Sequence, residues 1–374
     1  MNADRNTPRN ILLVSASLEG GGAERQLVQM ANYWAAQGVR VTLATWSGRD
    51  VADFYRVSDG VRRVHLDTED TGTPLRALRT SWRRVARLRA LLRVERPDAL
   101  VSFITQNNVL AISAAAGLPL RVVVSERADP AHDVTVRRGW RLLSRLVYLR
   151  ADLVVAQTYR VAEWIQRRYR AKVSVIPNSL RGLASRNESR EPLVLAVGRL
   201  TRQKGFDVLL DAFALLHDEF PHWQVAVLGV GPEYATLQSQ IHRLGLDGRV
   251  TLAGIHADIE SWLARAGIVV QPSRFEGFPN VVLEAMGMGA AVISSDCPAG
   301  PSEIIEDNVD GRLVPVGDVA ALAAAMRTLM QDPMARARLG DAARSVRERF
   351  HPDRIMAQWD QALFPSAPSE VVNG

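Results

Sequence analysis

Two glutamates, Glu276 and Glu284, stand on either side of the expected start of one helix, with seven residues between them. Gly277 follows the first glutamate in a short loop. Pro279 suits the first turn of a helix, where its missing N–H costs nothing, and apolar residues continue that helix to Met286. Unpaired N–H groups and the dipole at a helix N-terminus favour an anion. The pattern predicts a ligand with both hydroxyls and phosphates, such as a sugar nucleotide. The other interpretation is a capped surface helix that carries Glu284 incidentally.

Three strand-end loops in the second half of the chain could supply the rest of such a site. The strand expected at 268–271 leads directly into the loop of Glu276. Another expected strand ends in the glycine-bounded loop 198–205, which carries Arg199 and Lys204, and a third ends in the loop 229–233. In α/β sheets, ligands bind beyond the carboxyl ends of the strands. Two cations, several glycine amides and two carboxylates could therefore converge on a departing diphosphate.

The sequence lacks several common metal-binding and phosphate-binding motifs. It contains no P-loop, no H-E-x-x-H, no paired C-x-x-C and no D-x-D pattern. We therefore expect no metal site and no cofactor, and Arg199 and Lys204 would neutralise the leaving diphosphate.

The first half of the chain begins with the same order of expected elements: a strand, a glycine-rich loop and a helix. A buried strand is expected at 10–16, Gly20, Gly21 and Gly22 follow it, and an amphipathic helix is expected at 23–34. The glycines would let the backbone approach a phosphate at the helix N-terminus. The spacing is not G-x-G-x-x-G, so it does not indicate a dinucleotide. A flexible strand-to-helix turn is the alternative.

Length, composition and charge indicate an ordinary globular protein with two unlike halves. The chain has 374 residues, 47% of them hydrophobic and 23% charged, which suggests two domains. Up to Val175 there are 28 Lys and Arg against 16 Asp and Glu, and from Ile176 there are 18 against 24, so the net charges are +12 and −6. A basic surface suits anionic lipid, nucleic acid or phosphorylated substrates. No nucleic-acid-binding module is recognisable.

Two basic helices account for much of the charge in the first half. In 75–94, apolar residues recur at helical spacing and seven arginines occupy other positions; 137–148 is similar. Either the apolar stripe of each helix packs in the domain core, or the helix lies on an anionic membrane.

A second group of polar residues follows the strand expected at 120–125. Glu126, Arg127, Asp129 and His132 stand after its carboxyl end and are candidates for an acceptor-side site. The alternative is a turn at Asp129 that leaves His132 as an ordinary loop residue.

The alternation of strands and helices stops at a polar segment and then restarts. We expect an N-terminal domain at 1–178, a linker at 179–191 and a C-terminal domain at 192–349. The single cysteine, Cys297, fits a reducing compartment, no apolar run approaches the ~20 residues that span a bilayer, and the N-terminus has no signal-peptide pattern. We therefore expect a cytoplasmic location.

Three motifs together resemble the GT-B glycosyltransferases of family 4, a retaining and metal-independent class. They are Gly20-Gly-Gly-Ala-Glu-Arg25, Gly198-Arg-Leu-x-x-x-Lys-Gly205 and the E-x7-E pattern of Glu276 and Glu284. The resemblance covers nearly the whole chain. It implies an α/β fold of two doubly wound, Rossmann-like domains that face a central cleft, with a last helix at 350–364 crossing back to the N-terminal domain.

The resemblance also implies a role for each candidate residue. Arg199 and Lys204 would hold the donor diphosphate, Glu276 would contact the donor sugar, and Glu284 would bind the ribose. The remaining donor-binding residues would be Gly21, Gly22, Gly277, Phe278, Pro279, Asn280 and, beside the base, Ile255. The departing phosphate oxygen would take the acceptor proton, so that no protein nucleophile is needed.

One departure from the family pattern concerns the acceptor side. Many members place a His where Glu126 and Arg127 stand here, and Ser125-Glu-Arg-x-x-Pro130 looks like the branch that builds exopolysaccharide or lipid-linked glycans. The expected function is transfer of a hexose or HexNAc from a nucleotide sugar, with UDP as the expected nucleotide, to a lipid-linked or polysaccharide acceptor. The location would be the inner face of the cytoplasmic membrane, contacted by the basic helices. The alternatives are a GT-B nucleotide-sugar epimerase and a catalytically dead membrane-surface binding protein.

Overall fold

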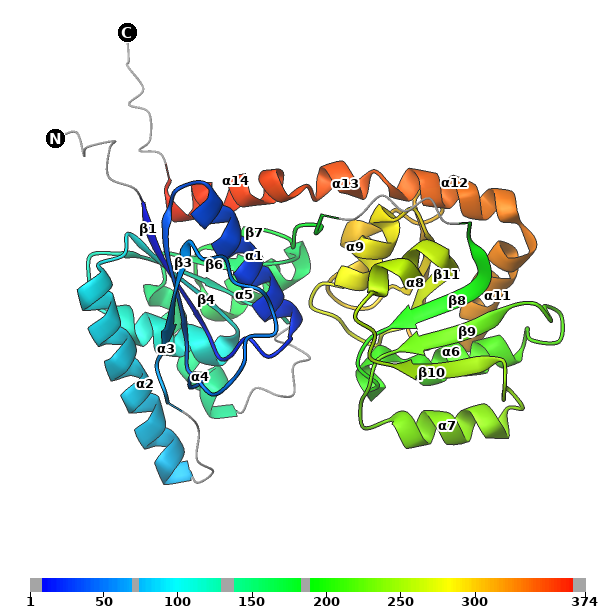
Figure 1. The fold of residues 1–374 in the computed structure, drawn as a ribbon, viewed down its shortest axis with the longest axis horizontal. Helices are drawn as coiled ribbons and strands as arrows, with labels where there is room; N and C mark the ends of the chain where they lie inside the picture. Colours follow the sequence, from blue (N-terminus) through cyan, green and yellow to red (C-terminus); the bar gives the residue numbers. More distant parts are fainter. Residues whose placement is uncertain (1–8, 69–73, 129–137, 183–188, 366–374) are drawn as a thin grey trace, which may run out of the picture. The chain divides into compact units, whose positions relative to one another are not determined.

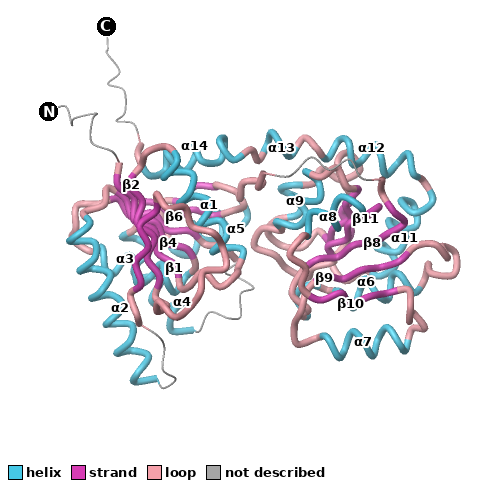
Figure 2. Tube along the Cα trace, in the orientation of Figure 1, coloured by secondary structure: helices cyan, strands magenta, loops and turns pink. Residues whose placement is uncertain are grey.

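The computed structural model describes residues 9–68, 74–128, 138–182 and 189–365. The chain divides into two units, one formed by residues 1–176 with 356–374 and the other by residues 177–355. Strands lie inside each unit and helices lie outside them (Figure 2). His132, one of the acceptor-side candidates, lies outside the described residues.

The first unit is built on a seven-stranded sheet in the order β3-β2-β1-β4-β5-β6-β7 (Figure 1). All described pairings are parallel. Strands buried on both faces read as continuous apolar runs, as the sequence of β1 does. The bounds are β1 Asn10–Ser15, β2 Arg40–Thr45, β3 Val61–His65, β4 Ala99–Phe103, β5 Arg121–Ser125, β6 Leu153–Ala156 and β7 Val173–Val175.

Helices connect these strands and complete the unit. Their bounds are α1 Gly22–Ala36, α2 Pro74–Glu95, α3 Thr105–Ala115, α4 Arg138–Val147, the 3-10 helix η1 Tyr148–Arg150 and α5 Tyr159–Tyr169. The C-terminal helix α14 (Pro352–Leu363) also packs on this sheet, as expected. The Trp359 ring lies 5.9 Å from that of Phe103, and Asp360 accepts a hydrogen bond of 2.8 Å from the indole of Trp34.

The second unit contains a six-stranded parallel sheet in the order β10-β9-β8-β11-β12-β13. The strands are β8 Glu191–Val197, β9 Gln224–Leu228, β10 Val250–Gly254, β11 Ala266–Gln271, β12 Ala291–Ser295 and β13 Arg312–Val314. The helical segments are η2 Arg202–Lys204, α6 Phe206–Ala214, α7 Tyr234–Arg243, α8 Ile259–Arg265, α9 Asn280–Gly287, α10 Pro301–Ile304, α11 Val319–Gln331, α12 Pro333–Ala343 and α13 Val346–Arg349.

Apolar cores fill both faces of the second sheet. Alternate side chains of a strand point to opposite faces, so Val194 and Ala196 join one core while Leu195 and Val197 join the other. The first core also contains residues of α6 and α11, and the second contains residues of α8 and α9. The prediction of two doubly wound parallel sheets is therefore confirmed.

The basic helix α2 uses several of its arginines inside its own unit. The Arg84 guanidinium donates to the carbonyl of Thr68, and that of Arg89 donates to the carbonyls of Ala114 and Ala116. The apolar stripe reaches the core at Leu88, which is fully buried. Trp82, in the same stripe, is 66% exposed, so the stripe is not in the core along its whole length.

Candidate functional site

Two strand-end loops meet where the strand order of the second sheet reverses. β8 and β11 are neighbours, while β9 follows on the side of β8 and β12 on the side of β11. Sheets of this class bind ligands at such a reversal point, beyond the carboxyl ends of the strands. The residues after β8 and β11, 198–205 and 272–279, come together there.

Hydrogen bonds tie these two loops to each other. The Arg274 N–H donates to the Gln203 carbonyl at 2.8 Å, and the Gln203 amide donates to the Phe275 carbonyl at 3.0 Å. The Arg274 guanidinium also donates to both carboxylate oxygens of Asp207, in the first turn of α6, at 2.8 and 2.7 Å. The loops thus hold a fixed geometry without depending on a ligand.

Two glycines allow neighbouring strand-end loops to approach each other closely. Gly205 has φ = +67°, and a Cβ there would lie 2.1 Å from the Pro272 carbonyl oxygen. Gly229, at the end of β9, has φ = +140°, and its Cβ would lie 2.0 Å from the Gly198 carbonyl oxygen. Any side chain would push the loops apart, which explains the glycine at each position.

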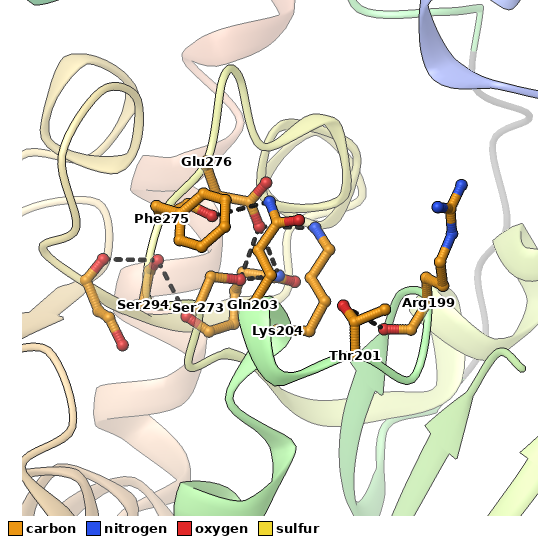
Figure 3. Close-up of polar contacts among 10 residues, drawn as sticks. Arg199, Thr201, Gln203, Lys204, Ser273, Phe275, Glu276 and Ser294 are labelled. Atoms are coloured by element: carbon orange, nitrogen blue, oxygen red, sulfur yellow. Dashed lines mark hydrogen bonds and ion pairs between the residues drawn. The ribbon is translucent and has the colours of Figure 1, made fainter. Parts of the chain in front are cut away.

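Glu276 is the centre of the resulting cluster (Figure 3). Its Oε1 lies 2.6 Å from the Lys204 ammonium and accepts hydrogen bonds from Ser273 Oγ at 2.6 Å and from Gln271 Nε2 at 3.0 Å. Glu276 is 5% exposed, so a buried carboxylate has a cation and two neutral donors on one oxygen. The sequence predicted Glu276 and Lys204 as site residues, and the structure brings them into contact.

The second carboxylate oxygen of Glu276 and several backbone amides keep their hydrogen-bonding capacity. No described residue donates to Oε2 of Glu276 or accepts from the N–H groups of Gly277, Phe278 and Val281. The Asn280 N–H, by contrast, donates to the Phe278 carbonyl at 3.0 Å. Helix α9 begins at Asn280 with Pro279 as its N-cap residue, and no side chain caps it. An acceptor oxygen and a set of donors therefore flank the same helix start.

Arg199 lies on the same loop as Lys204 but is not part of the Glu276 cluster. Its side chain is exposed and extends away from the cluster (Figure 3). Ile255, the residue predicted to lie beside the base, directly follows β10, and its side chain is 76% exposed. Both side chains are accessible to a ligand, and neither has a fixed partner among the described residues.

Glu284 lies inside α9, where it is 4% exposed, and shares a guanidinium with a second carboxylate. Arg181 Nη2 is 3.5 Å from Glu284 Oε2, and Arg181 Nη1 is 3.5 Å from Oε1 of Glu260 in α8. The predicted linker therefore supplies a cation to a predicted ligand residue. No sequence feature indicated this contact, because nothing in a polar linker shows which helix it packs on.

The predicted phosphate loop of the first unit has the expected local structure. Gly21 is the N-cap residue of α1, which begins at Gly22, and no side chain caps this helix. The Gly21 carbonyl accepts a hydrogen bond of 3.2 Å from the hydroxyl of Tyr55. The loop follows β1, which borders the reversal of strand order between β1 and β4.

The acceptor-side candidate Glu126 is buried and accepts hydrogen bonds from two hydroxyl groups. It is 3% exposed and directly follows β5. Thr105 Oγ1, at the start of α3, lies 3.1 and 3.0 Å from its two oxygens, and the Tyr148 hydroxyl of η1 also donates to it. Asn108 Nδ2 lies 3.1 Å from that same hydroxyl. Burial, and after it the charge of Glu126, raises the pKa of Tyr148 well above its ordinary value, so the hydroxyl stays a donor.

Arg127 packs its guanidinium over the Phe103 ring, 4.3 Å from the centroid. Burial lowers the pKa of Arg127 to about 9, which still leaves it charged at neutral pH.

Among the candidate-site residues that sequence reasoning missed, Gln271 is the easiest to recognise afterwards. It is a polar residue at the end of an apolar strand, just before the loop of Glu276.

The buried thiol of Cys297 lies near the cluster but has no reactive character. Burial, and after it the charge of Glu276, raises the pKa of Cys297 to about 12. A protonated thiol is a poor nucleophile and a poor metal ligand.

Family models match both units. Residues 20–180 match the model described as Glycosyltransferase Family 4, and residues 191–332 match the one described as Glycosyl transferases group 1. Together the two matches cover most of the chain. The chain belongs to glycosyltransferase family 4.

Two bacterial enzymes are among the proteins whose sequences are similar to this chain. An exopolysaccharide phosphotransferase of Streptomyces coelicolor is 30% identical over 80% of this chain, which spans only 33% of that protein. A Campylobacter jejuni N-acetyl-D-galactosaminyltransferase, named for an undecaprenyl-diphosphate-linked acceptor, is 26% identical over 93% of this chain and 96% of its own length.

Solved structures show the fold to be GT-B. Sucrose-phosphate synthase of Thermosynechococcus elongatus superposes with a TM-score of 0.83 at 21% identity, over 95% of this chain and 98% of that one. The HepE protein of Anabaena, solved with UDP, gives 0.76 at 21% identity, over 95% and 99%. The predicted family and fold class are therefore confirmed.

Proposed function

We propose that the protein transfers a hexose or HexNAc from a nucleotide sugar to a lipid-linked or polysaccharide acceptor, with UDP as the nucleotide. One observation carries the proposal. The Lys204–Glu276 ion pair lies where the strand order of the second sheet reverses, and Oε2 of Glu276 and the N–H groups of Gly277 and Phe278 beside it are open to a ligand. The Anabaena HepE structure with UDP supports the choice of nucleotide. The Campylobacter jejuni relative, which is named for an undecaprenyl-diphosphate-linked acceptor, supports the acceptor class.

Each group in the cluster has a chemical task in this proposal. Lys204 and the exposed Arg199 neutralise the diphosphate, and the amides after Glu276 add hydrogen bonds to it or to the sugar. Glu276 accepts from a sugar hydroxyl through Oε2, and Glu284 accepts from the ribose. Gly21 and Gly22 provide further amides for phosphate oxygens, and Ile255 packs against the base.

We propose front-face transfer with retention and without a metal ion. The bond between the anomeric carbon and the phosphate oxygen breaks, and the acceptor oxygen bonds to the same face of that carbon. The proton of the acceptor hydroxyl moves to the departing phosphate oxygen, so that nucleoside diphosphate leaves and the protein forms no covalent bond. The cations stabilise the charge that develops on the diphosphate.

Membrane contact is part of this proposal, and α4 carries it better than α2. Leu142, Leu146 and Leu149 are 62%, 65% and 59% exposed, at helical spacing along α4 and η1. Arg145 and Arg150 lie on the same segment, and residues 139–150 contain no acidic residue. Exposed leucines beside arginines suit a bilayer surface with anionic headgroups. No described helix is long and apolar enough to cross a bilayer.

Product analysis with the purified protein tests the activity. UDP-, GDP- and ADP-sugars are incubated with an undecaprenyl-diphosphate-linked acceptor, and nucleotide release and the anomeric configuration of the product are measured. We expect UDP release, an α-linked product from an α-linked donor, and unchanged turnover with EDTA. An epimer formed from UDP-sugar alone would support the epimerase alternative, and the absence of any nucleotide binding would support the dead binding protein.

Liposome flotation tests the membrane contact. We expect binding to vesicles with anionic lipid that weakens as salt rises, and loss of binding in the variant Leu142→Ser/Leu146→Ser/Leu149→Ser. Equal flotation of this variant and the wild type would contradict a role for α4.

A further inference from the structure

Residues 178–181, which follow β7, are held beside helix α9 by Asn178, Leu180 and Arg181. The Leu180 N–H donates to the Phe350 carbonyl at 2.8 Å, and the Leu180 side chain joins the apolar core that contains α9. Asn178 Nδ2 donates to Oδ1 of Asn280, the first residue of α9, at 2.7 Å. The next side chain, Arg181, lies near Glu284 of that helix. The described residues at the start of the segment predicted as a linker thus have a defined place beside the proposed donor site.

Arg181 balances two carboxylates that come from different helices. Its Nη1 and Nη2 each lie 3.5 Å from a carboxylate oxygen, one on Glu260 and one on Glu284. Glu284 has 5% of its side chain exposed and Glu260 has 19%. Two carboxylates this close to one guanidinium repel each other once the cation is removed. Solvent screens this repulsion less at the more buried carboxylate, Glu284.

The guanidinium contacts both carboxylates without saturating its own donors. Its Nε and Nη2 atoms are buried and have no hydrogen-bond acceptor in the described part of the chain. Separations of 3.5 Å are long for a charge-assisted hydrogen bond, so Arg181 acts on Glu284 through charge more than through a fixed hydrogen bond.

We propose that Arg181 is a positioning residue for the nucleotide: it holds the Glu284 carboxylate in place to accept hydrogen bonds from the ribose hydroxyls. This inference rests on the proposed function, in which Glu284 binds the ribose. Arg181 acts through Glu284 and does not touch the reacting atoms. Asp258, whose side chain caps α8 at the Ser261 N–H, keeps Glu260 in the first turn of α8 and so completes the arrangement.

Ribose-selective binding is the measurement that separates this role from a merely structural one. UDP and 2′,3′-dideoxyuridine 5′-diphosphate are titrated calorimetrically into wild type, Arg181→Ala, Arg181→Lys and Glu284→Gln. We expect Arg181→Ala to weaken UDP binding about 10-fold, a typical loss for a charge-assisted contact, and to leave the dideoxy ligand within about twofold. Arg181→Lys should recover part of the loss.

Two further variants complete the design. Arg181→Ala/Glu260→Gln removes the competing carboxylate and should recover part of the UDP affinity. Arg327→Ala breaks a surface ion pair with Glu219, half-exposed and elsewhere in the same unit, and should leave both affinities unchanged. In turnover, Arg181→Ala should raise KM for the donor and leave kcat unchanged.

The outcomes separate the inference from the function on which it rests. If wild type binds no nucleoside diphosphate, the proposed function fails. If wild type prefers UDP to the dideoxy ligand and Glu284→Gln removes that preference while Arg181→Ala keeps it, only the role of Arg181 is overturned. Equal losses for both ligands in Arg181→Ala would also overturn it, because they would indicate a general structural defect.

Discussion

Glu276 and Glu126 occupy comparable places in two sheets of the same kind, yet they are held in opposite ways. Each follows the carboxyl end of a parallel strand, and each is almost fully buried, with exposures of 5% and 3%. Glu276 has Lys204 and two neutral donors on a single oxygen. Glu126 has hydroxyl donors within reach of both of its oxygens, from α3 and from η1.

The difference separates a carboxylate that can take a ligand from one that joins elements of the fold. A buried carboxylate is costly unless it is paired, and both environments meet that cost. At Glu276 the partners converge on one side and leave Oε2 open. At Glu126 two of the partners come from different helical segments, so the carboxylate ties α3 and η1 to the end of β5.

Glu276→Gln should give the largest effect on activity. The amide cannot attract a sugar hydroxyl as a carboxylate does, so turnover should fall about 10²–10³-fold, as when a single electrostatic contact to a transition state is removed. The unfolding free energy should change by about 1 kcal/mol or less, because the side-chain oxygen still accepts from Ser273. Nucleotide release and urea unfolding measure the two quantities. Full turnover in this variant would contradict the role of Glu276.

Glu126→Ala should show the reverse pattern. The hydroxyls of Thr105 and Tyr148 lose a buried acceptor, so the unfolding free energy should fall by about 3 kcal/mol, since each unsatisfied group costs about 1–3 kcal/mol. UDP affinity should stay within about twofold. Urea unfolding and calorimetry check both expectations. The shape-conserving Glu126→Gln tests the predicted acceptor-side role, which requires a higher KM for the acceptor. A stable Glu126→Ala protein with lost UDP affinity would reverse the comparison.

The sequence was sufficient to predict the fold, because its apolar runs and glycines are compatible with few other arrangements of the backbone. Continuous apolar strands that alternate with helices predict buried parallel sheets, and the glycines at 205 and 229 mark close approach of loops. Motif spacing was also sufficient to place Glu276 and Lys204 on neighbouring strand ends. The Lys204 ammonium and the Glu276 carboxylate lie 2.6 Å apart in the structure.

The sequence was insufficient wherever a partner came from an unmarked position. Arg181 lies in a polar segment, and only packing on α9 gives it Glu284 as a neighbour. The partners of Glu126 were hidden for the same reason, because Thr105 and Tyr148 lie in helical segments with no motif. Periodicity could not decide between core and surface at Trp82, which is 66% exposed, since it describes a helix face and not what covers that face.

Lys204→Met sharpens the Glu276 side of the comparison. It removes the cation beside Glu276 and keeps most of the side-chain length, so UDP affinity should fall about 10–100-fold, the range for a lost charge-assisted phosphate contact. Calorimetry at two salt concentrations measures the loss, and the difference between variant and wild type should shrink at high salt. Arg327→Met is the matched control, since it removes a half-exposed surface cation from the same unit. Equal UDP affinity in Lys204→Met and Arg327→Met would show that Lys204 does not bind the diphosphate.

Tyr148→Phe should give the smallest effect and tests whether Glu126 serves the fold through one residue or several. The change removes only the hydroxyl between Asn108 and Glu126, while Thr105 still donates to the carboxylate. The unfolding free energy should therefore fall by about 1 kcal/mol, the net value of one hydrogen bond, and UDP affinity should not change. Tyr234→Phe is the control, because the Tyr234 side chain is half-exposed on α7. A loss as large as that of Glu126→Ala would place the whole contribution of the carboxylate in its bond to Tyr148, so that Thr105 would contribute nothing.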